Sequence, residues 1–469
     1  MSQQSPKTHF KQSLGLFDAT MLVAGSMIGS GIFIVSADIS RNVGSAGWLI
    51  IIWLLTGLMT MAAAVSYGEL SGMFPKAGGQ YTYLKEAYNP LIGFLYGWSF
   101  FAVIQTGTIA AVGVAFSKFT AYLWPELGED NIVLTVGSIN VSAAQVLAIA
   151  TIILLTWVNS RGVKNGKLIQ TTLTIIKVLS LAGLVICGFM FADGTVWEAN
   201  WTNAWDIHQL APDGTIAQYT TVAVLGAIAA AMVGSIFSSV AWENVTYIAA
   251  EIKNPKRNIG MGLFLGTLIV SLIYVATNLM YTAVLPMQEI ASAEKDRVAV
   301  AVSSVIFGPT GTTLIAVMIM ISTFGCNNGL ILSGARVYYT MAVDGLFFKK
   351  VGTLNRFAVP AFGLWIQCAV AAVLCLSGKY GDLLDMVSLV VVLFYVLTII
   401  AIFILRKKRP DAERPYKAFA YPVLPALFVL MGLAFCILLV VFKPEYTWPG
   451  LCIVLSGIPI YYLAMRKRN

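Results

Sequence analysis

Long stretches of apolar residues recur along almost the whole chain, with short polar segments between them. Each stretch reaches the roughly 20 residues that an α-helix needs to cross the hydrocarbon core of a bilayer. We therefore predict an all-α polytopic membrane protein with 12 transmembrane helices. Their expected ranges are 18–44, 47–73, 88–124, 141–160, 168–191, 218–250, 258–284, 304–340, 360–377, 383–405, 419–441 and 447–465. The third and eighth exceed the thickness of a bilayer, so we expect them to tilt or to extend past it.

The composition agrees with this class and excludes several others. The chain is 58% hydrophobic and 11% charged, whereas a soluble domain has about 25% charged residues. The six cysteines all lie in apolar stretches without metal-binding spacing, and both histidines lie outside these stretches. We therefore expect no metal, no cofactor and no catalytic centre, and we do not expect an enzyme.

The positive charge is distributed unevenly between the two sides of the predicted membrane. Most of the 30 Lys and Arg residues fall in segments on the side of the termini, for example in the run RKKRP at 406–410. Cytoplasmic loops carry such an excess. We expect both termini in the cytoplasm and a multi-pass protein of the cell membrane. The net charge of +8 then reflects topology and contact with anionic lipid, with no nucleic-acid partner.

Two runs of small and polar residues interrupt the apolar pattern. GSMIGSGIF (25–33) lies in the first predicted helix, and VGSIFSSVAWENVT (233–246) lies in the sixth. Gly25 and Gly29 form a G-x-x-x-G pair, which is typical of close packing between membrane helices. The alternative is a helix that stops and restarts, leaving N–H groups for an anion and carbonyls for a cation. Interrupted helices at equivalent places in two inverted halves are typical of a secondary transporter.

Four segments in order carry a family resemblance: LGLFDATMLVAGSMIGSGIF (14–33), SYGEL (66–70), PKAGGQYTYL (75–84) and KNPKRNIG (253–260). With them the chain resembles the amino acid–polyamine–organocation permeases, and among these most closely the L-type amino acid transporters and bacterial amino acid permeases. The resemblance implies a LeuT-like fold, a 5+5 inverted repeat with unwound helices 1 and 6.

The implied organisation has five parts along the chain. They are a cytoplasmic segment (1–17), the first inverted repeat with helices 1 to 5 (18–191), an extracellular loop (192–217), the second inverted repeat with helices 6 to 10 (218–405), and helices 11 and 12 with the cytoplasmic C-terminus (406–469).

The resemblance also implies where a substrate amino acid binds. Its carboxylate would meet the N–H groups of Gly29, Ser30 and Gly31. Its ammonium group would meet main-chain carbonyls in both unwound helices, near Met27, Ile28, Phe237, Ser238 and Val240. Phe237 matches an aromatic gate that closes over the substrate.

Two ionisable residues lie deep in predicted helices, where they are costly and therefore candidates for function. Lys177 matches a lysine whose ammonium group, in related permeases, occupies the place of the sodium ion of sodium-coupled relatives. It favours sodium independence, and it suits either exchange or proton coupling. Glu243 matches a position that varies with substrate in the family. Its carboxylate could pair with a cationic substrate, take up a proton, or form hydrogen bonds within the bundle.

Several polar residues are weaker candidates. Gln105 and Asn328 either line the pocket or join helices by hydrogen bonds. A second group of charged residues is expected to form ion pairs of a cytoplasmic gate: Glu69, Arg161, Glu251 and Arg336.

From these features we expect a sodium-independent L-amino acid transporter, an exchanger or a proton-coupled symporter, that works by alternating access. Its partners would be an L-amino acid, protons and the lipid bilayer, while the sequence leaves an accessory subunit open. A cationic amino acid or polyamine antiporter of the same fold is the first alternative, because of Glu243. A membrane-embedded proton-translocating subunit is an alternative from another class, but it would need a longer chain of ionisable groups than Lys177 and Glu243 provide.

Overall fold

The first apolar stretch folds as two helices, α1 (Leu16–Met27) and α2 (Gly31–Val43), whose axes differ by 42°. In the computed structural model, which describes residues 12–136, 139–377 and 380–466, the break consists of Ile28, Gly29 and Ser30. Ile28 has non-helical dihedral angles (φ −72°, ψ 88°). The predicted interruption of the first helix is confirmed.

The sixth stretch is interrupted as well. Helix α10 (Thr221–Ser238) is followed by a non-helical segment, the short helix α11 (Asn244–Tyr247) and the 3-10 turn η3 (Ala249–Glu251). Ala241 within the break has a φ of 68°, a region that residues other than glycine rarely adopt. The predicted interruption of the sixth helix is therefore confirmed too.

The other apolar stretches form the rest of the bundle. The helices of the first half are α3 (Ala46–Met73), α4 (Gln80–Ala87), α5 (Pro90–Ser99), α6 (Gln105–Leu123), α7 (Ala143–Ser160) and α8 (Val163–Met190), with the short turns η1 (Phe100–Ile104) and η2 (Pro125–Leu127). Those of the second half are α12 (Pro255–Val284), α14 (Val298–Val343), α15 (Ala361–Ser377), α16 (Tyr380–Lys408), α17 (Val423–Phe442) and α18 (Pro444–Arg466), with η5 (Lys349–Gly352).

The two long stretches reach their length in different ways. The third runs through α5, the π-helical turn η1 and α6 without a gap. The eighth is bent inside α14, where Gly308 has a φ of 65° and precedes Pro309. Proline removes a helical hydrogen bond and glycine tolerates positive φ. The residues before Gly308 therefore form a separate helical segment.

Helix length and composition give fewer membrane crossings than the twelve that the sequence pattern predicts. Among the described residues, nine helices are long and apolar enough to span a bilayer, and the pair α1–α2 raises this number to ten. Two further apolar helices, Ala361–Leu376 and Thr447–Leu463, are shorter. The all-α membrane fold is confirmed, whereas the exact count of twelve is not.

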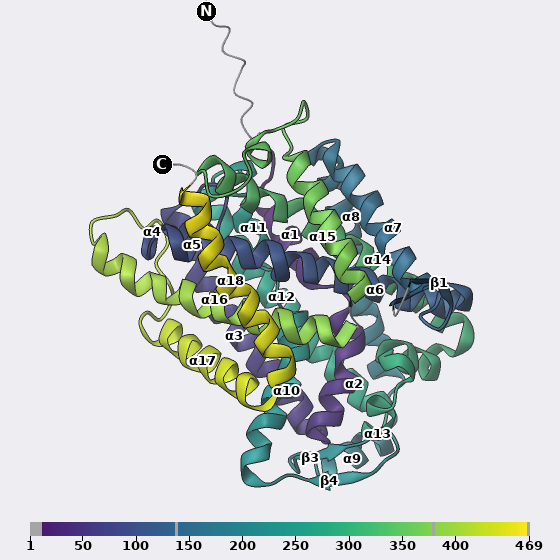
Figure 1. Cartoon of the computed structure of the whole chain (residues 1–469). Helices are drawn as coiled ribbons and strands as arrows, with labels where there is room; N and C mark the ends of the chain where they lie inside the picture. The colour runs from purple at the N-terminus through teal and green to yellow at the C-terminus, as the bar shows by residue number, and fades with distance from the viewer. Residues whose placement is uncertain (1–11, 137–138, 378–379, 467–469) are drawn as a thin grey trace, which may run out of the picture.

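The start of α1 and the end of α18 lie at one end of the bundle, which we call the terminal end, and the connecting segments at the opposite end contain further short helices and strands (Figure 1). The predicted loop 192–217 contains the helix α9 (Gly194–Thr202) and most of a hairpin of β3 (His208–Leu210) and β4 (Ile216–Gln218). Helix α13 (Met287–Ala291) and the turn η4 (Glu294–Asp296) lie at the same end.

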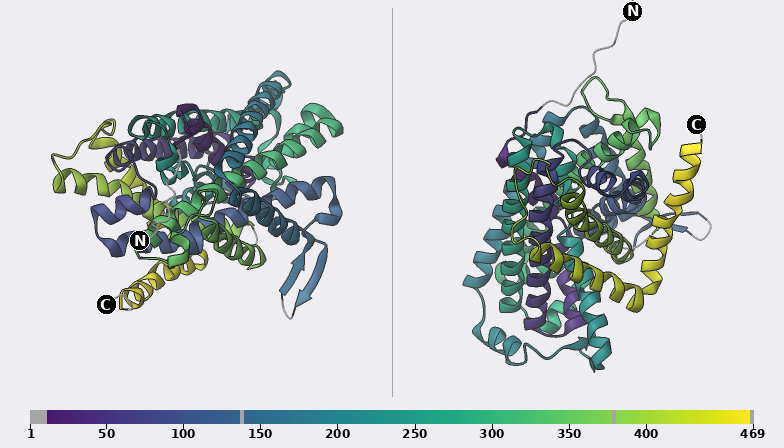
Figure 2. Two further views of the ribbon diagram at one scale, coloured as in Figure 1. Left: turned by 90° about the horizontal axis from the view of Figure 1, so that it is seen from above. Right: turned by 90° about the vertical axis from the view of Figure 1, so that its left-hand side faces the viewer.

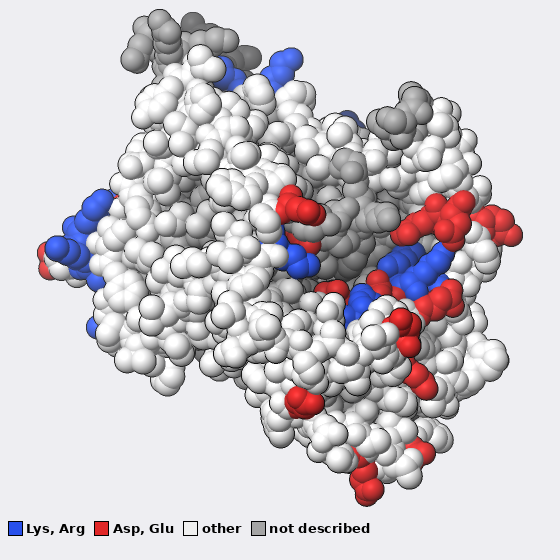
Figure 3. Space-filling model, turned by 60° about the horizontal axis from the view of Figure 1, so that its bottom comes forward, with Lys and Arg blue, Asp and Glu red and all other residues white. Residues whose placement is uncertain are grey.

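A second hairpin, of β1 (Ile132–Val136) and β2 (Ile139–Ser142), projects from the side of the bundle (Figure 2). Viewed with the end opposite the termini forward, acidic and basic side chains lie side by side (Figure 3). Arg41 of α2 and Lys118 of α6 both reach Asp296 of η4, at 2.8 and 3.7 Å.

Candidate functional site

Lys177 of α8 reaches the break between α1 and α2. Its Nζ lies 2.8 Å from the carbonyl oxygen of Ile28, donates also to the carbonyl of Gly25, and lies 3.5 Å from that of Ser322 on α14. The residue is buried, with 2% of its surface exposed. A buried ammonium group needs such acceptors, and the carbonyls that a broken helix releases need donors. The Lys177 ammonium group and the released carbonyl groups therefore satisfy each other's hydrogen-bonding needs.

The remaining carbonyls at the end of α1 also have partners. The Cys326 thiol lies 3.1 Å from the carbonyl oxygen of Ser26, and the Tyr274 hydroxyl lies 2.9 Å from that of Met27. Tyr274 belongs to α12, and its hydroxyl lies equally close, at 3.0 Å, to the carbonyl oxygen of Ser238 at the end of α10. One side chain thus joins the two breaks.

Tyr274 was not predicted from the sequence. It lies within a long apolar stretch in which a tyrosine has no distinctive spacing. Its position opposite two main-chain carbonyls follows from the packing of α12 against α1, which the sequence pattern does not give. Ser322 of α14, whose Oγ lies 3.4 Å from the carbonyl oxygen of Ile28, was missed for the same reason.

The structure brings the predicted residues of both breaks together. Gly31 begins α2 and faces the last turn of α10, where a Cβ atom added to Gly31 would overlap the Oγ of Ser238. The residues that the sequence assigned to both breaks are all buried: Met27, Ile28, Gly29, Ser30, Gly31, Phe237, Ser238 and Val240. Close approach of two main chains is what the glycine permits.

Two small cavities lie beside the contact between the two breaks. One, of about 10 Å³, includes Phe33 and Lys177, and the other, of about 20 Å³, includes Ser239 and Val240. A cavity needs about 10–15 Å³ to hold one water molecule. Neither holds an amino acid, so a substrate between the breaks would have to separate α2 from α10.

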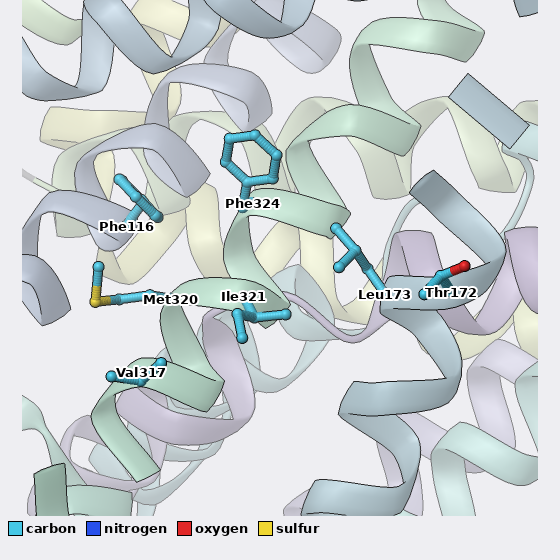
Figure 4. Close-up of a pocket in the computed structure, with 7 residues that line it drawn as sticks. All are labelled: Phe116, Thr172, Leu173, Val317, Met320, Ile321 and Phe324. Carbon is cyan, nitrogen blue, oxygen red and sulfur yellow. The ribbon is translucent and has the colours of Figure 1, made fainter. Parts of the chain in front are cut away.

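A larger groove of about 580 Å³ lies elsewhere, between α6, α8 and α14 (Figure 4). Its lining is apolar except for the hydroxyl of Thr172: Phe116, Thr172, Leu173, Val317, Met320, Ile321 and Phe324. These side chains are partly exposed on the surface of the bundle. The groove offers no charged group to a zwitterion, and we assign it to contact with lipid chains.

Glu243 sits in a cluster of tyrosines at the end of the break that follows α10. Its carboxylate accepts hydrogen bonds from the hydroxyls of Tyr395, at 2.6 Å, and Tyr247, at 3.3 Å. The Tyr247 hydroxyl lies 2.7 Å from that of Tyr96. Glu243 is 4% exposed, and within the described part of the chain no basic side chain forms an ion pair with it. Of the three predicted roles, the structure displays hydrogen bonding within the bundle.

Gln105 and Asn328 lie in contacts between helices. The Gln105 amide donates to the carbonyl of Leu330, at 2.6 Å. Asn328 accepts from Asn159 on α7, at 2.8 Å, and donates to Gln170 on α8, at 3.4 Å. These bonds match the packing alternative, and lining of the pocket stays a prediction.

Three of the four residues expected in gate ion pairs form an ion pair. Arg336 and Glu251 pair at 3.1 Å, and both are buried. Glu69, in contrast, pairs with Arg406 at 2.7 Å and Arg414 at 3.4 Å. The guanidinium group of Arg161 lies 4.0 Å from the centre of the Trp157 ring. Glu69, Glu251 and Arg336 thus lie in ion pairs as expected, whereas Arg161 forms none among the described residues. Glu69 finds its partners in and after α16 because that segment folds back onto α3. A role of these residues in a gate stays a prediction.

Comparison with known proteins identifies related sequences over nearly the entire chain. Residues 14–458 match a family described as amino acid permease. The chain is 28% identical to Asc-type amino acid transporter 1 of Mus musculus, over 99% of this chain and 83% of that protein. It is 29% identical to large neutral amino acids transporter small subunit 2 of Oryctolagus cuniculus, over 97% and 81%. It is also 28% identical to b(0,+)-type amino acid transporter 1 of Homo sapiens, over 98% and 90%.

Proposed function

The chain belongs to the amino acid permease family, and from this premise we propose that it moves L-amino acids across the cell membrane without sodium, by alternating access. It is an L-amino acid transporter and not an enzyme. The relatives named above are all amino acid transporters. The finer points, sodium independence, the coupling mode and the orientation, are proposals that rest on residues of this chain.

One observation carries the proposal of sodium independence. The Lys177 ammonium group lies at the broken end of α1, within hydrogen-bond distance of the carbonyls of Gly25 and Ile28. Carbonyl oxygens at such an end suit a cation. A covalently held ammonium group supplies that charge from the chain itself, so no dissolved ion is required.

We place the substrate between the two breaks. Its carboxylate would bind the N–H groups of Gly29, Ser30 and Gly31 at the N-terminal end of α2, where the helix dipole is positive. Its ammonium group would share carbonyls near Met27, Ile28, Phe237, Ser238 and Val240, and Phe237 would cover it. A carbonyl oxygen has two lone pairs, so acceptance from Tyr274 or Lys177 leaves room for a second donor.

We propose that both termini are cytoplasmic, because of the excess of basic residues at the terminal end. The Glu251–Arg336 pair, which lies beside the start of α1 through the bonds of Ser13 and Leu14 to the carbonyl of Glu251, is then part of the inner gate. The residues 18–191 and 218–405 would be the two inverted repeats, each beginning with an interrupted helix.

Uptake into proteoliposomes tests the function. Labelled leucine, alanine and arginine are offered with and without internal amino acid, with sodium or choline as the external cation, and with or without a pH gradient. We expect uptake that is equal in sodium and choline. Stimulation by internal amino acid indicates exchange, and stimulation by an inward proton gradient indicates symport. Uptake that requires sodium would contradict the proposal.

A cationic amino acid or polyamine is the second candidate substrate. The observation that favours it is the buried carboxylate of Glu243, which is held by tyrosine hydroxyls next to the break in α10. The same uptake assay decides between the candidates through the ratio of arginine to leucine transport.

A further inference from the structure

A groove of about 610 Å³ lies at the terminal end, between the first turns of α12, the helix α3 and the segment that joins α16 to α17. Its walls are apolar, with Met261 and Phe264 on α12 and Phe419 on the joining segment. These three side chains are 41%, 39% and 73% exposed. An exposed apolar patch of this size marks a surface that contacts the membrane or a protein partner.

Two cations line the same groove at its outer end. Lys256 and Arg257 occupy the first turn of α12, and both are exposed. Lys256 forms a solvent-exposed pair with Glu413, at 2.7 Å. Within the described part of the chain, Arg257 forms no ion pair. The groove therefore carries net positive charge.

The start of α12 adds to this charge. The helix has 30 residues, and Asn254 at its N-cap makes no side-chain capping bond. The N-terminal end of a helix carries a partial positive charge that attracts an anion. Pro255 has no N–H group, and the N–H groups of Arg257 and Asn258 bond the carbonyl of Asn254. The helix dipole and the two cationic side chains therefore supply the positive charge. Arg257 precedes Phe264 by seven residues, which corresponds to roughly 10 Å along a helix axis. A phospholipid presents its phosphate and its acyl chains in the same order.

We propose that this groove binds an anionic phospholipid of the surrounding bilayer. The phosphate lies between Lys256, Arg257 and the start of α12, and an acyl chain lies along Met261, Phe264 and Phe419. Charge complementarity favours an anionic over a zwitterionic lipid. Basic pockets beside membrane helices recognise anionic head groups in this way.

The groove is held in place by the segment on its far side. Tyr416 packs against Gly68 of α3, where an added Cβ would come within 2.9 Å of its ring. Glu69, next to Gly68, binds Arg406 and Arg414 and accepts from the N–H of Ala418. The joining segment is thereby fixed on α3 beside α12, so the groove exists before a lipid enters.

Native mass spectrometry of the purified full chain in detergent tests the proposal. Phosphatidylglycerol and phosphatidylcholine of equal chain length are added in turn to wild type, to Lys256→Gln/Arg257→Gln and to the matched control Lys349→Gln/Lys350→Gln. Lys349 and Lys350 are exposed cations elsewhere in the chain. We expect wild type and control to prefer phosphatidylglycerol.

The double variant should lose about fivefold in affinity per cation, hence roughly twenty-five-fold in total. Equal binding of both lipids by wild type, or unchanged phosphatidylglycerol binding by the double variant, would overturn the site. Phe419→Ser should weaken binding while all charges remain. If free glycerol phosphate displaces the lipid, or Phe419→Ser binds as wild type, the groove recognises a phosphate alone and the lipid proposal is overturned.

A consequence for transport rests on the proposed function. Lys253, directly before α12, donates from its N–H to the carbonyl of Leu14 at 2.8 Å. A lipid held at Lys256 and Arg257 would thus restrain the junction of α12 with the start of α1. Uptake should rise with the fraction of phosphatidylglycerol in wild type and not in the double variant. If no liposome shows uptake, the proposed function fails while the binding result stands.

Discussion

Gly31 and Ser238 bring the main chains of α2 and α10 so close that a single methyl group would not fit between them. The first residue lies directly after the break of one interrupted helix, and the second lies directly before the break of the other. A substrate that lies between the breaks must part these two residues. Gly31 and Ser238 are therefore one close contact between the two interrupted helices.

Gly31→Ala should impair transport, because the added methyl group overlaps the Ser238 side chain. Overpacking costs about 1–3 kcal/mol, which corresponds to roughly a tenfold loss of initial uptake rate if it falls on one state of the cycle. Gly183→Ala is the matched control, since nothing lies within 4 Å of its added Cβ. Partial recovery is expected in Gly31→Ala/Ser238→Gly. Normal uptake by Gly31→Ala would show that the contact is loose in solution.

Lys177→Ala should lose most uptake while the protein is still expressed. The carbonyl of Gly25 loses its donor and that of Ile28 keeps only the Ser322 hydroxyl. A buried unsatisfied group costs about 1–3 kcal/mol. We expect at least about a hundredfold slower uptake. Sodium chloride should restore part of it relative to choline chloride, since the vacated carbonyls suit a small cation. Lys295→Ala, which removes an exposed ion pair with Asp130, is the control. Wild-type uptake by Lys177→Ala would refute the role of the ammonium group.

Tyr274→Phe should slow uptake more than its control variant does, although the two variants lose similar stability. The variant removes the hydroxyl that lies 2.9 Å from the Met27 oxygen and 3.0 Å from the Ser238 oxygen. Tyr88→Phe is the control, because its hydroxyl donates to the carbonyl of Leu397 at 2.8 Å, away from the breaks. Both should lose about 1 kcal/mol of stability, measured by thermal unfolding in detergent. If uptake falls equally in both, Tyr274 has no special role.

Glu243→Gln should change substrate preference or the pH profile of uptake. Glutamine still accepts the hydrogen bond of Tyr395 through its amide oxygen, so the fold is retained while the charge is lost. We expect the ratio of arginine to leucine uptake to fall by about tenfold if the carboxylate faces a cationic side chain. An altered pH profile with an unchanged ratio indicates protonation instead. A variant identical to wild type in both measurements would make Glu243 structural.

Glu251→Gln should destabilise the protein much more than Glu413→Gln. Glu251 pairs with Arg336 in the interior, whereas Glu413 pairs with Lys256 at the surface. Removal of one partner from a buried pair costs about 3–5 kcal/mol, and an exposed pair contributes about 0–1 kcal/mol. The unfolding temperature in detergent should therefore drop for Glu251→Gln and stay near wild type for Glu413→Gln. Equal drops would indicate that the inner pair contributes no more than the exposed one.

The sequence predicted the parts of the site that depend on local preference. Glycine and serine runs weaken a helix wherever they occur, so both breaks could be located, and Lys177 was conspicuous among apolar neighbours. Partners that depend on packing could not be found. Tyr274 has no local signature, and the arginines that pair with Glu69 lie more than 300 positions further along the chain. No periodicity within one helix contains such information.

The two breaks also influence how selectivity for the substrate side chain can change in evolution. Main-chain atoms are the same whatever residue is encoded, so an anchor made of them survives most point mutations. In the proposed site, every α-amino acid would present the same ammonium and carboxylate groups to these main-chain atoms. Preference for a particular substrate side chain would then depend on the surrounding residues, and these can change by mutation without loss of the main-chain contacts to the substrate.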